Sequence, residues 1–142
     1  AGYAATPLAR KLGIKAGTRV LLDAAPPSFE DLLEGLPDAV TLARSMRGTR
    51  PFDTIISFNT RATRLSRRLP ALVDRLGTNA GLWIAWPKRT AALDTDLRDA
   101  AVRAAGLETG LVDNKVCAID ETWSALRFVF RLKDRPARAA RR

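Results

Sequence analysis

The segment 110–131 holds the densest group of reactive side chains in the sequence. Two apolar runs, 116–119 and 126–130, frame it, so its polar groups fall at a strand–turn–strand junction. An Asp–Lys pair beside an aromatic ring can bind a small polar ligand, and paired carboxylates can hold Mg²⁺. The candidate ligand-binding residues of this segment are Asp113, Asn114, Lys115, Asp120, Glu121 and Trp123.

A purely structural role for the same residues is the more economical one. Asn114 and Asp120 are residue types that shape turns, and Lys115 can pair locally at a sheet edge. Trp123 can simply cover the core.

A second group of candidates follows from strand ends. Asp23, Asn59, Trp86 and Lys88 each stand at or just after the end of an apolar, strand-like run. Ligands of open α/β sheets bind outside the carboxyl ends of parallel strands, so these four residues are predicted to contribute to a ligand site. The alternative is ordinary loop chemistry, in which Asn59 caps a helix and Pro87 ends a strand.

Basic residues give a third candidate. Arg61, Arg64 and Arg68 flank the apolar face of a predicted helix and could bind a polyanion, although arginine stems often just cover the margin of a buried face. The net charge of +9 also favours a polyanion as partner. However, six of the 24 Lys and Arg residues lie in 131–142, so part of this charge belongs to the C-terminal segment. We predict a basic, disordered tail at 134–142 that aids solubility and binds polyanions weakly at most.

Missing residue types exclude several chemistries. The sequence contains no histidine, which excludes Ser-His-Asp catalysis, Cys-His catalysis and the common zinc sites. We predict no catalytic residue and no metal ligand. Cys117 is the lone cysteine and lies in an apolar run, which favours a small core residue. No apolar run approaches the ~18 residues of a membrane span, so we expect a cytoplasmic protein. We expect it to be a monomer or a homodimer.

Strand-like and helix-like runs alternate along residues 1–133, which predicts one Rossmann-like domain. The last two strands are joined too tightly for a helical crossover and should be antiparallel. The predicted fold is a three-layer α/β sandwich with a mainly parallel sheet and an antiparallel C-terminal strand pair. Strands are predicted at 19–25, 39–43, 52–58, 82–86, 111–119 and 124–132, and helices at 8–13, 29–36, 60–76 and 95–105.

The order of these elements resembles the later part of the class I S-adenosylmethionine-dependent methyltransferase fold. The local likeness is at 79–86, which looks like that family's glycine-containing turn into its fifth strand. The resemblance implies a cofactor-binding glycine-rich turn after the first strand. Here that strand runs into Ala24-Ala25-Pro26-Pro27, which has no glycine and two residues without a backbone N–H, so no cofactor is assigned.

The chain also resembles a family of small bacterial proteins of unknown function, DUF-three-zero-five-two. The similarity rests on residues 2–3, 6–9 and 11–14, on WIAWPK at 83–88, and on LVDNKVCAIDETWS at 111–124. It implies no activity. The leading hypothesis is therefore a non-catalytic module that binds an unknown small ligand or protein partner. A divergent methyltransferase-like enzyme and a polyanion or nucleic-acid binder are the alternatives.

Overall fold

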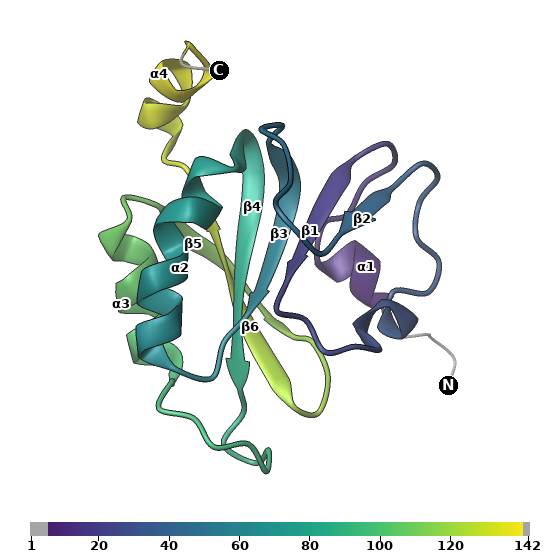
Figure 1. Ribbon diagram of the computed structural model, residues 1–142, viewed down its shortest axis with the longest axis vertical. Coiled ribbons are helices and arrows are strands. Elements are labelled where there is room, and N and C mark those ends of the chain that lie inside the picture. The colour runs from purple at the N-terminus through teal and green to yellow at the C-terminus, as the bar shows by residue number, and fades with distance from the viewer. Residues whose placement is uncertain (1–5, 141–142) are drawn as a thin grey trace.

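The computed structural model describes residues 6–140. They form a single six-stranded sheet with helices on both faces (Figure 1). The helical elements are α1 (Leu8–Lys11), α2 (Ala62–Asp74), α3 (Asp99–Glu108) and α4 (Arg135–Ala140), with 3₁₀ turns η1 (Phe29–Leu32) and η2 (Leu132–Asp134). The strands are β1 (Arg19–Asp23), β2 (Thr41–Ala43), β3 (Phe52–Phe58), β4 (Leu76–Pro87), β5 (Val112–Ala118) and β6 (Trp123–Val129).

The order of strands across the sheet is β2-β1-β3-β4-β6-β5. The first four are parallel to one another, and β6 lies antiparallel between β4 and β5. β1 and β3 are almost entirely buried because helices or turns cover both faces of the central sheet. The structure confirms the predicted Rossmann-like α/β fold with its antiparallel C-terminal pair.

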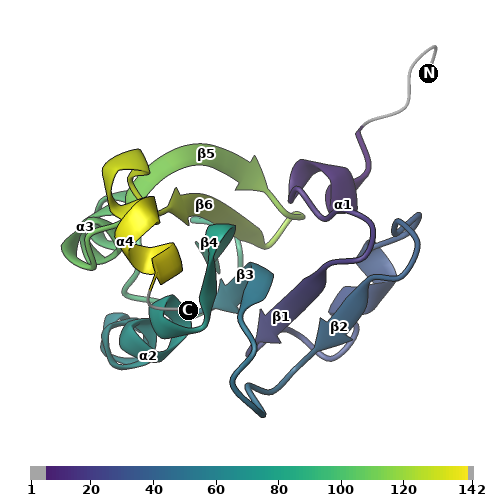
Figure 2. The same ribbon diagram turned by 90° about the horizontal axis from the view of Figure 1, so that it is seen from above.

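The two faces of the sheet are covered unequally. α2 and α3 pack against one face, whereas the short α1 lies on the other (Figure 2). The indole N–H of Trp83 in β4 donates to the carbonyl of Leu12 at 3.0 Å and fixes α1 to the sheet. Toward β5 this second face carries no long helix among residues 6–140.

Several predicted helix boundaries differ from the structure, and at the start of α2 the reason is a residue that is distant in sequence. Where a helix at 29–36 was predicted, only η1 forms, and the Ser28 side chain does not cap it. α2 begins at Ala62, whose N–H donates to the Asp96 carboxylate at 2.8 Å, and Asn59 caps nothing. α3 begins at Asp99, later than the predicted 95.

The described part of the basic tail is helical. Where disorder was predicted from residue 134, residues 135–140 form α4. Arg138 donates to the carbonyl of Val73 at 2.9 Å and stacks over Phe130 at 4.9 Å, which docks α4 near the end of α2. The motif residues 2–3 and the tail residues 141–142 lie outside the described part of the chain. None of the helices formed by residues 6–140 has the length and apolar character that crossing a membrane requires.

Candidate functional site

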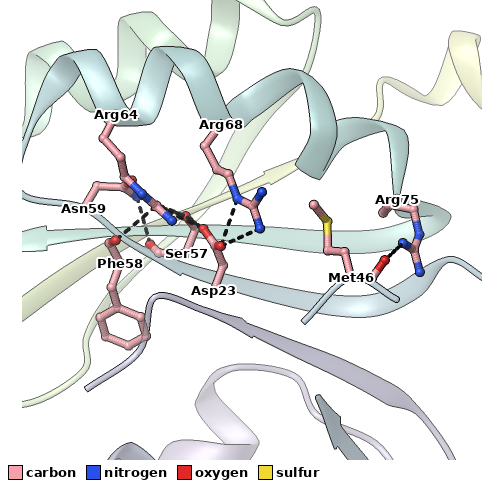
Figure 3. A network of polar contacts seen from close by, with 8 residues as sticks. All are labelled: Asp23, Met46, Ser57, Phe58, Asn59, Arg64, Arg68 and Arg75. Atoms are coloured by element: carbon pink, nitrogen blue, oxygen red, sulfur yellow. Dashed lines mark hydrogen bonds and ion pairs between the residues drawn. The ribbon is translucent and has the colours of Figure 1, made fainter. Parts of the chain in front are cut away.

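A buried carboxylate stands at the carboxyl end of the parallel strands. Asp23 is the last residue of β1 and is only 3% exposed. The hydroxyl of Ser57 in the neighbouring β3 donates to its Oδ2 at 2.7 Å. Arg64 Nη1 lies 3.0 Å from Oδ2 and Arg68 Nη2 lies 3.0 Å from Oδ1 (Figure 3). Both oxygens are thus fully used by donors from β3 and α2.

Asn59 belongs to the same network. Its side-chain amide donates to the Ser57 hydroxyl at 3.1 Å, and its Oδ1 accepts from Arg64 at 2.6 Å (Figure 3). The rule that parallel strand ends meet at one edge therefore does bring Asp23 and Asn59 together. The Ser57 hydroxyl and the Arg64 guanidinium connect the two side chains.

The network keeps Asp23 ionised. Burial on its own would raise the pKa of this carboxyl group. The hydrogen bonds from Arg64 and Ser57 and the positive charges of Arg64 and Arg68 outweigh burial, so the pKa lies below its ordinary value. Asp23 is consequently a poor proton donor or acceptor at neutral pH, and its evident role is to hold α2 against the sheet.

The arginines predicted as a polyanion patch are occupied by partners within the chain. Arg64 and Arg68 pair with Asp23, and Arg61 pairs with the exposed Asp94. Farther along, the buried Arg75 donates to the carbonyls of Met46 at 2.6 Å and Arg50 at 2.7 Å. These side chains attach α2 to the end of β1 and to two surrounding loops, which leaves them little free charge for a polyanion.

The turn after β1 is the place where the methyltransferase resemblance would put a cofactor, and Arg44 occupies it. From just beyond β2, its guanidinium donates to the carbonyls of Ala25 at 3.0 Å and Pro26 at 2.8 Å, and to Glu30 at 2.6 Å. The hydrogen bond from Arg44 lowers the pKa of Glu30 to about 2. The turn itself is strained, because Ala24 has φ +57°.

Such a turn does not fit a cofactor that is held by backbone N–H groups. Pro26 and Pro27 have no N–H, and their carbonyl oxygens point at the Arg44 cation. A glycine-rich turn offers the opposite polarity, with donors and open space for a close approach. The observed residues therefore give no basis for a cofactor-dependent step at this turn.

A basic cavity of about 480 Å³ lies at the carboxyl end of β4. Trp86 and Lys88 line it together with Ser124 of β6, and the start of α3 closes another side. Lys88 is held in place through its backbone, whose N–H donates to the carbonyl of Thr122 at 2.8 Å. The lining residues are Trp86, Lys88, Arg89, Arg98, Asp99, Ala100 and Ser124.

The candidates of the 113–123 segment do not meet in one cavity. Asp113 pairs with Arg103 of α3, while Lys115 lies in a different hollow beside Cys117. Asp120 accepts the backbone N–H groups of Thr122 and Trp123, both at 2.8 Å, which is turn chemistry.

The remaining candidates of that segment also divide between core and surface. Trp123 packs edge-on against Phe58 at 5.0 Å within the core, and Glu121 is exposed. Asn114 accepts from Arg127 at 3.4 Å. Burial raises the pKa of the Cys117 thiol, so it does not behave as an activated nucleophile. Among residues 6–140, no three acidic or cysteine side chains approach closely enough to hold a metal ion.

Comparison with solved structures identifies the fold. A S-adenosylmethionine-dependent methyltransferase from Aquifex aeolicus superposes with TM-score 0.58 at 14% identity, over 84% of this chain and 85% of that one. Aeropyrum pernix fibrillarin with natively bound S-adenosylmethionine gives TM-score 0.57 at 10% identity, over 90% and 70%. The chain has a methyltransferase-type Rossmann fold.

A third solved structure agrees. Magnesium protoporphyrin IX methyltransferase from Synechocystis, with bound S-adenosylhomocysteine, gives TM-score 0.53 at 10% identity, over 82% of this chain and 75% of that one. Neither a protein-family model nor a curated protein sequence matches the chain. At these identities the structural similarity establishes the fold and leaves the activity open.

Three residues of these sites escaped the sequence reasoning. Ser57 sits inside an apolar strand, where a serine attracts no notice, and only β1–β3 pairing places it beside Asp23. Arg44 binds mostly backbone carbonyl groups. Every residue has such a group, so no pattern of side chains in the sequence indicates its partners. Arg98 is the basic residue immediately before α3, and a correct prediction of the start of this helix would have identified it.

Proposed function

We propose that the protein binds a small anionic molecule in the basic cavity beside Trp86, without classical catalysis. The observation that carries this proposal is the cavity of about 480 Å³ at the carboxyl end of β4. Ligands of open α/β sheets bind outside the carboxyl ends of the strands, at points where the strand order reverses. The cavity meets the first condition through the end of β4, whereas the strand order reverses between β1 and β3, where Asp23 and Ser57 lie.

The charges around the cavity favour an anion. Lys88, Arg89 and Arg98 line it, and the single acidic residue of the lining, Asp99, already pairs with Arg103 at 3.0 Å. Among residues 6–140, neither the Lys88 ammonium nor the Arg89 guanidinium forms a hydrogen bond or an ion pair. Arg98 stands at the N-terminus of α3 and leaves its N–H groups uncapped by a side chain, which adds to the positive potential.

A titration with adenosine monophosphate, followed by amide chemical shifts in NMR, tests the proposal. The backbone amides of 86–89, 98–100 and 124 should shift saturably, whereas neutral adenosine should shift them much less. Lys88→Gln and Arg98→Gln should each weaken binding by about tenfold or more, since a charge-assisted hydrogen bond contributes about 1.5–3 kcal/mol. Arg67→Gln on α2 removes the same charge outside the cavity and should leave binding unchanged. Unshifted amides at millimolar adenosine monophosphate would contradict the proposal.

A divergent S-adenosylmethionine-dependent methyltransferase is the second candidate function. It is supported by the solved structures that share the fold, some of them with bound S-adenosylmethionine or S-adenosylhomocysteine. The Arg44 contacts at the β1 turn oppose it.

Calorimetry with S-adenosylmethionine separates the two functions. We expect no saturable heat from either the natural chain or Arg44→Ala. Saturable binding that shifts the amides of Ala24 and Ala25 and weakens in Asp23→Ala would favour the methyltransferase instead.

A further inference from the structure

Three cations on the thinly covered face of the sheet have no acidic partner among residues 6–140. Lys11 of α1 and Lys115 of β5 line one hollow of about 380 Å³, and no carboxylate contributes to its lining. Arg127 of β6 stands directly across from Lys115 in the β5–β6 pairing. Among residues 6–140, none of these three cations forms an ion pair.

The position of Arg127 depends on a glycine. A Cβ atom at Gly81 of β4 would lie 2.3 Å from Arg127 Nε, so only glycine lets the guanidinium lie across the neighbouring strand. Within the described range 6–140, its one hydrogen-bond partner is the Asn114 side chain, at a weak 3.4 Å. The sequence thus makes room for a half-buried cation that no carboxylate within 6–140 neutralises.

This arrangement is costly for the isolated fold. Like charges placed directly opposite on adjacent strands destabilise a sheet, as Arg127 and Lys115 are. Burial, followed by the charge of Arg135, lowers the pKa of the Arg127 guanidinium. Elsewhere in the chain the buried or half-buried arginines Arg64, Arg68 and Arg75 bind carboxylates or several carbonyls. A bound anion would supply the countercharge that the three cations of this face lack among residues 6–140.

We infer that this face, formed by Lys11, Lys115 and Arg127, binds the phosphate backbone of a single-stranded nucleic acid. The cations come from three elements and lie on an open surface, which suits an extended polyanion better than an enclosed small molecule. Val116 borders the hollow at the edge of the sheet and is 71% exposed. The net charge of +9 favours the same class of partner.

The inference changes where the sequence placed the polyanion site. Arg61, Arg64 and Arg68 lie on α2, across the sheet, and each already has a carboxylate partner. The hollow of the new surface shares no lining residue with the anion cavity beside Trp86, although the charge of Lys88 acts on Cys117 of that hollow. The two proposals can therefore fail independently.

Fluorescence anisotropy with a labelled 15-nucleotide single-stranded RNA, between 50 and 200 mM salt, tests this surface. The double variant K11Q/K115Q changes two exposed residues, and K115Q/R127M includes the half-buried cation. Each should weaken binding by at least tenfold and make the log–log salt dependence shallower by about 1.4, the value for two lost phosphate contacts on a single strand. The double variant R61Q/R67Q removes the same net charge from α2 and should bind within twofold of the natural chain.

Four outcomes would overturn the inference. One is equal weakening by K11Q/K115Q and R61Q/R67Q, which would mean that net charge alone attracts the RNA. Another is loss of binding only when 134–142 are deleted, which would assign it to the tail. A third is absence of RNA binding at 100 mM salt together with shifts at 115–118 caused by adenosine monophosphate, which would point to a small phosphorylated ligand. The last is loss of RNA binding in Lys88→Gln, which would merge the two sites. If K115Q/R127M does not fold, K11Q/K115Q decides.

Discussion

Replacing Asp23 with asparagine tests whether the buried network at the end of β1 anchors the fold. Asp23 is 3% exposed, and its two oxygens face Arg64, Arg68 and the Ser57 hydroxyl. An asparagine of the same shape removes the negative charge and points an amide N–H₂ at groups that are themselves donors. Two guanidinium groups would then face each other with only one acceptor between them.

The size of the effect follows from the burial of each partner. Removing one member of a fully buried ion pair costs about 3–5 kcal/mol. Both guanidinium side chains here are 34% exposed, so water screens part of the uncompensated charge. We therefore expect Asp23→Asn to lower the free energy of unfolding by about 2–3 kcal/mol, a drop of about 1 M in the urea midpoint.

Urea unfolding monitored by circular dichroism at pH 7 measures this change. Asp94→Asn is the matched control, because it breaks the exposed pair with Arg61 and should cost less than about 1 kcal/mol. Arg68→Met should cost less than Asp23→Asn, since Arg64 and Ser57 still neutralise and hydrogen-bond the carboxylate. A urea midpoint for Asp23→Asn within error of the control would refute the anchoring role.

Three further predictions concern pH and backbone geometry. Because the folded-state pKa of Asp23 is lowered, its contribution is complete above the unfolded pKa of about 4 and is lost as the pH falls below it, so acid titration should destabilise the natural chain more steeply than Asp23→Asn. Ala24→Gly should raise the unfolding free energy by about 0.5 kcal/mol, because φ is +57° there, whereas Ala92→Gly in a loop should lower it in the same thermal melts. Gly106→Ala should destabilise by about 1–3 kcal/mol, since its Cβ would lie 2.1 Å from the Phe128 ring, and a stabilised variant would show that the ring moves freely.

The fold is well predicted from the sequence because short apolar runs mark the strands, and each run can be recognised from neighbouring residues alone. β3 spans the predicted residues, and the short link between 119 and 123 correctly indicated an antiparallel pair. Helix boundaries were less accurate, since the start of α2 is stabilised by Asp96, 34 residues away in sequence. No pattern within the helix itself reveals such a partner.

The candidate residues near 113–123 show why proximity in sequence misled. Residues two apart on a strand normally share a face, which would put Asp113 and Lys115 together. The irregularity between them inserts Asn114, so Asp113 turns toward Arg103 of α3 while Lys115 turns toward the α1 side. A single extra residue separates the carboxylate from the ammonium, and nothing in the composition of the segment predicts it.

The β1 turn shows where a shared fold stops being informative about function. Its position is the one at which a doubly wound sheet can receive a ligand, yet its chemistry is set by two prolines and by Arg44. Carbonyl oxygens directed at a guanidinium form a cation site, and the cation is part of the chain. A glycine-rich turn would direct its backbone groups at a ligand. Here the backbone carbonyls of the turn bind Arg44 instead and connect the end of β2 to the end of β1. We therefore propose that a partner binds at cations outside this turn, near Trp86 at the end of β4 and around Arg127 of β6.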